Sequence, residues 1–208
     1  RPRRRHHRGG TRRPAAAGGL SPVAAPAGHE RPFGWRAADF ALPDPDGRIH
    51  RLADAARAKG LVVMFICNHC PYVKGTIAEI VRDAKTLAGE GIGSVAIMPN
   101  DVAAYPADGP AEMKKFAAAH NLPFHYLYDQ SQQTARAYGA VCTPDFFGFD
   151  KNLGLRYRGR LMPVKGTTPV PGGSRELLAA MRQIAATGQG PADQYPGIGC
   201  SIKWRAGR

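Results

Sequence analysis

Residues 61–70 read Leu-Val-Val-Met-Phe-Ile-Cys-Asn-His-Cys, and this stretch decides the fold. Its apolar, β-branched run predicts a buried strand, and a helical pattern begins directly after it, at Pro71. Two cysteines separated by two residues, at the end of a strand and the start of a helix, can close a small disulfide ring. The helix N-terminus also carries partial positive charge, which favours a thiolate over a thiol. The stretch therefore predicts a redox pair, Cys67 and Cys70, rather than a non-redox turn with two buried thiols.

The residues of this Cys-Asn-His-Cys motif have separate expected roles. We expect Cys67 to be the nucleophile, because the first cysteine of such a motif is the more exposed and lies near free backbone N–H groups. Cys70, one turn later, is positioned to resolve a mixed disulfide at Cys67. A protonated His69 would stabilise the Cys67 thiolate and make the disulfide more oxidising. The alternative for His69 is an exposed loop histidine.

Two further cysteines lie outside the pair. Cys142 stands beside Thr143-Pro144 and is expected to be a small buried core residue rather than a third redox thiol. Cys200 lies on a Gly/Pro-rich C-terminal segment. It can fold back as a second resolving thiol, or belong to a tail that packs through Ile202 and Trp204.

A metal site is the competing use of the same residues. Cys67, His69 and Cys70, with Cys200 or Cys142, are ligand types that Zn²⁺ accepts. Structural zinc sites with four cysteines usually contain two close pairs, and this chain has one. We therefore predict no metal and no cofactor.

Composition limits the class of protein. The net charge of +13 is uneven, since residues 1–34 hold eight arginines against the single acid Glu30, which is +7 and leaves +6 for the other 174 residues. That segment lacks apolar periodicity and is expected to be a disordered basic Ala/Gly/Pro-rich tail without specific nucleic-acid binding. The strongly apolar run 61–67 is too short for a membrane span. Residues 11–28 lack the apolar stretch of a signal peptide, so we expect a cytoplasmic protein.

The order of the predicted elements indicates one α/β domain at residues 35–187, followed by a C-terminal tail at 188–208 that carries Cys200. Strands alternate with helices, which predicts a mixed sheet covered on both faces, and Cys-x-x-Cys beside a βαβ pattern is typical of a thioredoxin-like fold. The expected elements are a hairpin at 40–50, helices at 52–58, 71–91, 110–121, 131–138 and 174–186, strands at 61–66, 92–98 and 125–128, and a hairpin at 141–161.

Several separated blocks of the chain resemble one family. The blocks are residues 65–74, 126–130, 137–147, 157–160 and 199–204. They are similar to the peroxiredoxin-like branch of the thioredoxin superfamily, the redoxin or AhpC/TSA-type proteins, over about residues 35–208. The resemblance implies a thioredoxin-like fold, with a central mixed sheet, helices on both faces and an N-terminal β-hairpin extension. It also implies thiol-based oxidoreductase or antioxidant activity. In such folds a cis-proline at the place of Thr143-Pro144 faces the disulfide and supports pairing with the substrate backbone.

The sequence departs from the peroxiredoxin pattern. A peroxiredoxin has a proline seven residues and a threonine or serine three residues before its peroxidatic cysteine. Here those positions hold Val63 and Cys67 before Cys70, and Gly60 and Met64 before Cys67. The family also uses an arginine to polarise the peroxide, and the available arginines are Arg136, Arg156 and Arg158.

These observations predict a thiol–disulfide oxidoreductase that uses a Cys67–Cys70 disulfide, with Thr143 and Pro144 on the substrate face. Its expected partners are a thiol or disulfide protein and an external thiol reductant. The first alternative is a thiol-dependent hydroperoxide reductase acting on a small peroxide. The second is a non-catalytic metal- or partner-binding module that keeps the fold.

Overall fold

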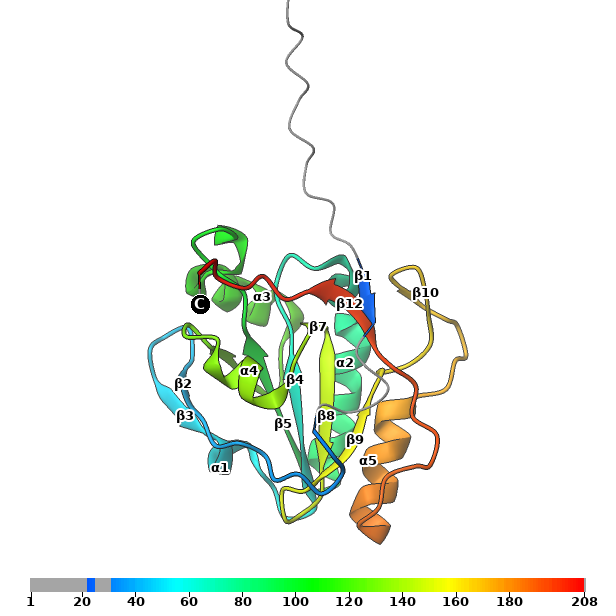
Figure 1. Cartoon of the computed structure of the whole chain (residues 1–208). Helices are drawn as coiled ribbons and strands as arrows, with labels where there is room; N and C mark the ends of the chain where they lie inside the picture. The colour runs from blue at the N-terminus through cyan, green and yellow to red at the C-terminus, as the bar shows by residue number, and fades with distance from the viewer. Residues whose placement is uncertain (1–21, 25–30, 208) are drawn as a thin grey trace, which may run out of the picture.

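A five-stranded mixed sheet forms the centre of the molecule (Figure 1). The computed structural model describes residues 22–24 and 31–207. Strand order is β6-β5-β4-β8-β9, with β4 parallel to β5 and β5 parallel to β6, whereas β8 is antiparallel to both β4 and β9. The strands are β4 (Gly60–Phe65), β5 (Ile92–Met98), β6 (His125–Tyr128), β8 (Asp145–Phe149) and β9 (Leu155–Gly159).

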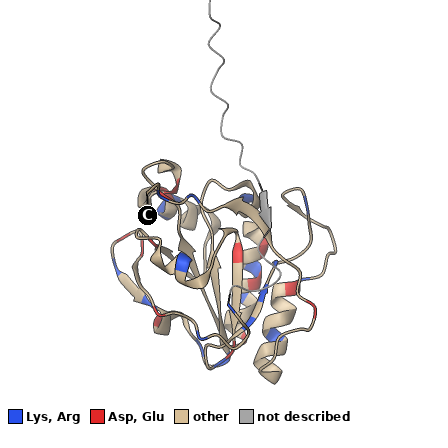
Figure 2. Ribbon diagram, in the orientation of Figure 1, with Lys and Arg blue, Asp and Glu red and all other residues tan. Residues whose placement is uncertain are grey.

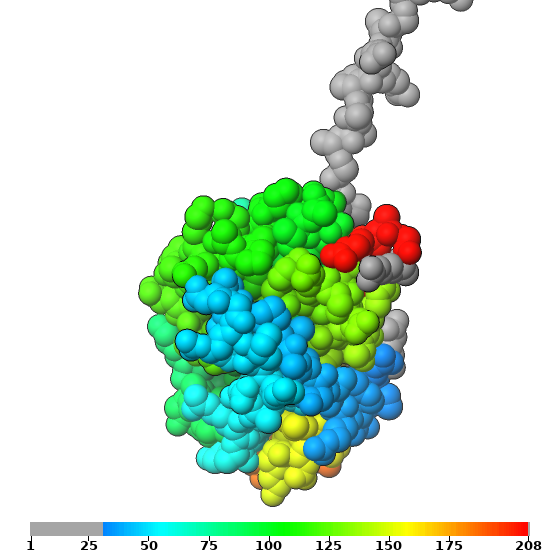
Figure 3. Space-filling view, turned by 90° about the vertical axis from the view of Figure 1, so that its left-hand side faces the viewer, coloured from blue at the N-terminus to red at the C-terminus, as the bar shows by residue number. Residues whose placement is uncertain are grey.

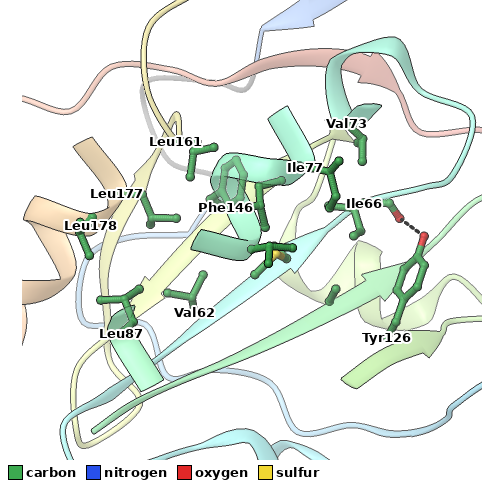
Figure 4. Packing of buried hydrophobic residues seen from close by; sticks show 14 of the residues in the cluster. Val62, Ile66, Val73, Ile77, Leu87, Tyr126, Phe146, Leu161, Leu177 and Leu178 are labelled. Atoms are coloured by element: carbon green, nitrogen blue, oxygen red, sulfur yellow. Dashed lines mark hydrogen bonds between the residues drawn. The ribbon is translucent and has the colours of Figure 1, made fainter. Parts of the chain in front are cut away.

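Side-chain alternation along β4 explains why both faces of the sheet are covered. Val62 and Met64 pack on the face of the long helices, whereas Leu61, Val63 and Phe65 pack on the opposite face. The first face is covered by α2 (Pro71–Gly89), α3 (Pro110–His120) and α5 (Glu176–Thr187), as the close-up shows for α2 and α5 (Figure 4). A buried strand between two apolar layers needs a continuous apolar run, and residues 61–66 provide it.

The opposite face is covered by short elements and by the N-terminal part of the described chain. They are α1 (Leu52–Ala55), α4 (Gln133–Tyr138) and the antiparallel hairpin of β2 (Ala41–Pro43) and β3 (Ile49–Arg51). Seen from this side, the residues coloured blue and cyan spread over the surface (Figure 3). Charged residues lie mainly on helices and loops, and the central strands carry few of them (Figure 2). The predicted hairpin and the α/β architecture are thus confirmed.

A second sheet, of three strands, lies at the edge of the molecule beside the N-terminal end of α2 (Figure 1). Its order is β1-β12-β7, and both pairs are antiparallel. The strands are β1 (Pro22–Ala24), β7 (Cys142–Thr143) and β12 (Ile198–Ser201). Within the expected tail 188–208, residues 198–201 are therefore a paired strand of the fold. A further hairpin joins β10 (Val164–Lys165) to β11 (Thr168–Pro169).

The observed elements differ from expectation at a few ends. The helix expected over 52–58 ends at Ala55, because Arg57 already bridges to Gly60 at the start of β4. The strand expected from 141 to 149 is divided into β7 and β8 at Pro144, which has no N–H for a ladder. The expected basic tail, 1–34, lies outside the described residues except at 22–24 and 31–34. Among the described residues, none of the helices combines the length and apolar character that crossing a membrane requires.

Candidate active site

Both cysteines of the motif lie at the junction of β4 and α2, fully buried. Ile66 still donates a backbone hydrogen bond to Ile97, which extends the strand to the residue before Cys67. Cys70 is the N-cap residue of α2, and Pro71 occupies the first helical position, where no N–H partner is needed. Both residues have an exposed fraction of 0%. The expectation that Cys67 is the more exposed of the two is therefore wrong for this structure.

The Thr143-Pro144 segment faces the cysteine pair, as the family resemblance implied. The peptide bond between these residues is cis. Cys67 Sγ lies 3.4 Å from Thr143 Oγ1, and Cys70 Sγ lies 3.1 Å from the Thr143 carbonyl oxygen. One residue thus contacts both sulfurs, and it fixes the pair between the end of β4 and the start of β8.

The interaction between the two neighbouring thiols separates their pKa values. It lowers the pKa of Cys70 to about 5 in spite of burial, and the Cys200 thiol and the backbone N–H groups of Val73 and Cys200 add to this effect. The same interaction, then burial and then the charge of Asp108 raise the pKa of Cys67 well above its ordinary value. The pKa of Cys70, the cysteine closer to the helix amides, is accordingly lower than that of Cys67. The sequence analysis expected the more easily formed thiolate at Cys67.

Cys200 belongs to the same cluster. It lies on β12, opposite Thr143 in the register of β12 and β7, and its side chain is buried. Burial and then the hydrogen bond to Cys70 raise its pKa to about 12. The alternative expectation, a C-terminal segment that packs through Ile202 and Trp204, also holds. Ile202 is buried in the core, and the Arg136 guanidinium lies 4.3 Å from the centre of the Trp204 ring.

Cys142 is separate from the three clustered sulfurs. It is fully buried on β7, and its Sγ lies 3.5 Å from the Pro144 carbonyl oxygen. Burial, and then the charge of Asp145, raise its pKa well above the ordinary value. It therefore fits the expected description of a small buried core residue.

Asp108 is a site residue that the sequence reasoning missed. It ends the short 3₁₀ helix η1 (Pro106–Asp108) and is fully buried. Its Oδ1 accepts the backbone N–H groups of Asn68 (2.8 Å) and His69 (3.3 Å), and its Oδ2 accepts from His69 Nδ1 (2.6 Å) and Asn100 Nδ2 (2.9 Å). Burial raises its pKa, but the hydrogen bonds and charge of these partners lower it overall. Asp108 thus holds the Cys-Asn-His-Cys loop in place through three of these hydrogen bonds, and the fourth ties it to Asn100.

His69 is turned toward Asp108 more than toward Cys67. Its Nδ1 lies 2.6 Å from Asp108 Oδ2 and 3.8 Å from Cys67 Sγ, so the Nδ1 hydrogen points at the carboxylate. The ring stacks on Tyr105, with centroids 5.5 Å apart and an interplanar angle of 10°. It is only partly exposed, so the alternative of an exposed loop histidine is wrong.

The nearest approach to a metal site among the described residues involves Cys67, His69 and Asp108, whose ligand atoms lie within 4.8 Å of one another. This set differs from the one the sequence suggested, because it includes a carboxylate and omits Cys70. The 2.6 Å between His69 Nδ1 and Asp108 Oδ2 is a hydrogen-bond distance. Two ligands of one tetrahedral zinc with bonds of about 2.0–2.1 Å lie about 3.3 Å apart. The observed geometry therefore fits a hydrogen bond between these side chains.

The three arginines considered for peroxide binding already have other partners. Arg158 is buried and donates to Asp145 Oδ2 (3.0 Å) and to the Gly139 carbonyl (2.8 Å). Arg156 pairs with Asp150 at 2.7 Å, and Arg136 stacks on Trp204. Asp145 follows the cis-proline and also accepts the Val141 N–H, so its pairing with Arg158 supports the loop that carries Thr143.

A mainly apolar cavity of about 320 Å³ lies beside Pro144. Its wall combines the start of α2, the start of β8 and the residue that opens β12. The lining includes Tyr72, Pro144, Phe146, Leu161, Met162 and Ile198. The cavity gives the cis-proline face room for an apolar side chain of another molecule.

Comparison with known proteins agrees with this geometry. A family model described as the AhpC/TSA family matches residues 33–158. The crystal structure of an uncharacterized conserved protein from Geobacillus kaustophilus is 41% identical, with a TM-score of 0.84, and the similarity covers 91% of this chain and 100% of that chain. Peroxidoxin BcpB from Mycobacterium tuberculosis is 19% identical, with a TM-score of 0.57, over 74% of this chain and 99% of that chain. Such a likeness concerns the fold, and it confirms the thioredoxin-like fold predicted from the sequence.

One curated protein supplies a relative with a named activity. The thiol-disulfide oxidoreductase ResA from Geobacillus thermodenitrificans (strain NG80-2) is 29% identical over 126 residues, which is 57% of this chain. The chain spans 64% of the length of that relative.

Proposed function

This chain belongs to the AhpC/TSA family, and from that premise we propose that it is a thiol–disulfide oxidoreductase whose redox pair is Cys67 and Cys70. The observation that carries the proposal is the placement of both cysteines at the start of α2 and against the cis Thr143-Pro144 bond, where Thr143 contacts both sulfurs. It supports dithiol chemistry because the interaction between the two thiols lowers the pKa of Cys70 and raises that of Cys67. The name of the curated ResA relative adds support for the same chemistry.

The proposed reaction begins with a proton transfer inside the pair. The proton of Cys67 moves to Cys70, which leaves a thiolate on Cys67. That thiolate attacks one sulfur of a substrate disulfide, a mixed disulfide forms, and the other substrate sulfur leaves as a thiolate. Cys70 then loses its proton and attacks Cys67, which breaks the mixed disulfide and releases the second substrate thiol. The substrate is reduced by two electrons, and the pair is oxidised to a disulfide.

The surroundings of the pair support each step of this scheme. The amides of Val73 and Cys200 stabilise a Cys70 thiolate when Cys67 is in the mixed disulfide. The Thr143 hydroxyl stabilises a thiolate on Cys67, since it lowers the pKa of that thiol. His69 is a positioning residue, because its hydrogen bond to Asp108 holds the loop of residues 67–70 in place. A protein thiol or disulfide with an apolar neighbour fits the cavity beside Pro144, and an external thiol restores the pair. A cytoplasmic location, as the sequence predicts, would supply that thiol.

The experiment compares two reactions in the full-length protein. Reduction of a protein disulfide is followed with dithiothreitol as electron donor, and consumption of hydrogen peroxide is followed separately. We expect disulfide reduction by the wild type, at least a 100-fold loss in Cys67→Ser and Cys70→Ser, and wild-type rates in the matched control Cys142→Ser. Trapping then assigns the order of attack, because Cys70→Ser should accumulate a mixed disulfide with the substrate and Cys67→Ser should not.

Two results would overturn the proposal. Peroxide consumption that depends on Cys67 or Cys70, without disulfide reduction, would make the protein a thiol-dependent hydroperoxide reductase. Inactivity of the folded wild type in both assays, together with stoichiometric bound zinc, would make it a metal-binding module. A mixed disulfide in Cys67→Ser instead of Cys70→Ser would reverse the proposed roles of the two cysteines.

A further inference from the structure

Cys70 has two cysteine neighbours. Its Sγ lies 3.1 Å from the carbonyl oxygen of Thr143, the residue opposite Cys200 in the register of β12 and β7, and all three cysteines belong to one buried cluster. The Cys67 thiol, the Cys200 thiol and the Cys200 backbone N–H all lower the pKa of Cys70. Cys67 and Cys70 are neighbours in sequence, whereas Cys200 comes from a strand 130 residues later. The redox pair is thus part of a cluster of three sulfurs with Cys70 in the middle.

The position of Cys200 is fixed by backbone pairing. β12 pairs with β7 so that Cys200 lies opposite Thr143. Gly199 allows this close approach, since a Cβ at that residue would lie 2.2 Å from the Thr143 carbonyl oxygen. Cys200 is only 2% exposed, and the Tyr72 backbone N–H points at its sulfur. Covering the site would require only an apolar side chain at this position of β12. The thiol at residue 200 therefore indicates a chemical role.

We propose that Cys200 is a third redox cysteine, which exchanges with the Cys67–Cys70 disulfide to form a Cys70–Cys200 disulfide. The proposal rests on the proposed function, because that reaction produces the disulfide that is moved. In the exchange, the Cys200 thiolate attacks the sulfur of Cys70. The bond between the sulfurs of Cys70 and Cys200 forms, the bond between those of Cys67 and Cys70 breaks, and the electron pair leaves with Cys67 as a thiolate. The protein contains one disulfide before and after the step, so no further oxidant is needed.

The charges around Cys200 favour this step after oxidation of the pair rather than before it. In the reduced protein, burial and then the neighbouring Cys70 keep the Cys200 thiol protonated, because both raise its pKa. Once Cys70 is bonded to Cys67, its negative charge and its role as acceptor are lost. The Lys203 ammonium and the Tyr72 N–H, which lower the pKa of Cys200, remain. The attacking thiolate therefore becomes easier to form when there is a disulfide to attack.

The consequence is a free Cys67 in an oxidised protein. Disulfide transfer to Cys200 returns Cys67 to the thiolate form that attacks substrate. The protein stays oxidised, with its disulfide now between Cys70 and Cys200 on β12. The second disulfide then joins α2 and β12, each of which contributes a wall residue, Tyr72 and Ile198, to the cavity beside Pro144. An external thiol reductant needs access to that side only, so it does not compete with substrate at Cys67.

Disulfide mapping tests the inference on the full chain. The reduced protein is treated with one equivalent of oxidised glutathione, quenched in acid, blocked with N-ethylmaleimide at free thiols and digested with trypsin without reduction. Tryptic cleavage after Lys59, Lys74, Arg182 and Lys203 places Cys67 and Cys70 in one peptide, 60–74, and Cys200 in another, 183–203. Cys142 falls in a third peptide, 137–151. A Cys67–Cys70 disulfide therefore stays within one peptide, and a Cys70–Cys200 disulfide joins two.

We expect the joined peptides in wild type beside the internal disulfide, and as the main product in Cys67→Ser. They should be lost in Cys200→Ser and unchanged in the control Cys142→Ser. The inference is overturned if Cys67→Ser, folded by circular dichroism, gives no joined peptides while the wild type reduces protein disulfides. If the wild type lacks disulfide reductase activity but Cys67→Ser still gives the joined peptides, the proposed function fails and Cys200 remains a redox partner of Cys70.

Discussion

Replacing Asp108 by asparagine would show how far one buried carboxylate holds the active-site loop. The carboxylate accepts four hydrogen bonds, two at each oxygen, and is fully buried. Asparagine has nearly the same shape but only one acceptor oxygen. If that oxygen keeps the backbone N–H groups of Asn68 and His69, the new NH₂ group faces the amide of Asn100. Asn100 cannot turn over freely, because its Oδ1 accepts the Lys203 N–H at 2.9 Å.

The expected loss of stability follows from these contacts. One buried donor left without a partner costs about 1–3 kcal/mol, and losing the charged hydrogen bond to His69 costs about 1.5–3 kcal/mol. The free energy of unfolding of Asp108→Asn should therefore fall by about 2.5–6 kcal/mol. His69→Ala is the matched variant, since it removes the imidazole and leaves the bonds to Asn68 and Asn100. In a double-mutant cycle the two changes should couple by at least about 1.5 kcal/mol, because both remove the same bond.

Urea unfolding of the reduced proteins, followed by circular dichroism, measures these values. The reduced state is required because oxidation of the pair adds a cross-link to the native chain. A loss below about 1 kcal/mol in Asp108→Asn would refute the reasoning, since it would mean that the buried donors find other partners. Additivity of the two changes within about 0.5 kcal/mol would refute the specific bond between Asp108 and His69.

Two further predictions concern the sulfur cluster. Absorbance at 240 nm should show one thiolate forming at about pH 5 in the reduced protein and absent in Cys70→Ser; a first ionisation at or above pH 8 would contradict the lowered pKa of Cys70. Because folding lowers that pKa, the Cys70 thiolate makes its full contribution to the free energy of unfolding at pH values above the ordinary thiol pKa. This contribution decreases as the pH falls and is lost as the pH passes through about 5. Gly199→Ala should detach β12, abolish the cross-link between Cys70 and Cys200 and raise the pKa of Cys70. Gly89→Ala, at a helical glycine with open space around it, is the control, and an intact cross-link in Gly199→Ala would contradict the prediction.

The central sheet follows from local sequence. The apolar run 61–66 and the segment 92–98 are short, apolar and bounded by glycines or a turn, which favours buried strands, and the second was predicted with its observed bounds. The hairpin at residues 40–50 follows from Asp46-Gly47, a strong turn signal. The pair of cysteines and the Thr-Pro segment were also predicted, because their chemistry is carried by short motifs. In each case the deciding interactions are local or repeat along one element.

The missed features depend on partners that are distant in sequence. β12 is four residues long and contains a glycine, so no alternation marks it; it is a strand because β7 and β1 supply its hydrogen bonds. Asp108 lies in a Pro/Ala/Gly-rich stretch without periodicity, and its loop partners are 39 and 40 residues earlier. The lower pKa of Cys70 depends on the Cys200 thiol and amide together with the interaction between the two thiols of the pair. The only local hint of Asp108 was the position of an acidic residue two places before Pro110, where a helix was expected to begin.

The pairing of β12 with β7 also has a consequence for how the protein is made. Thr143 and Cys200 are 57 residues apart in the chain, so at about 5–20 residues per second Cys200 is added roughly 3–11 s after Thr143. During that interval the nascent chain can form the strands and helices around Cys67 and Cys70, but it lacks the donors that β12 contributes. The cysteine pair is therefore assembled in two stages. Its thiols acquire their final reactivity only when the last strand has been synthesised and has docked.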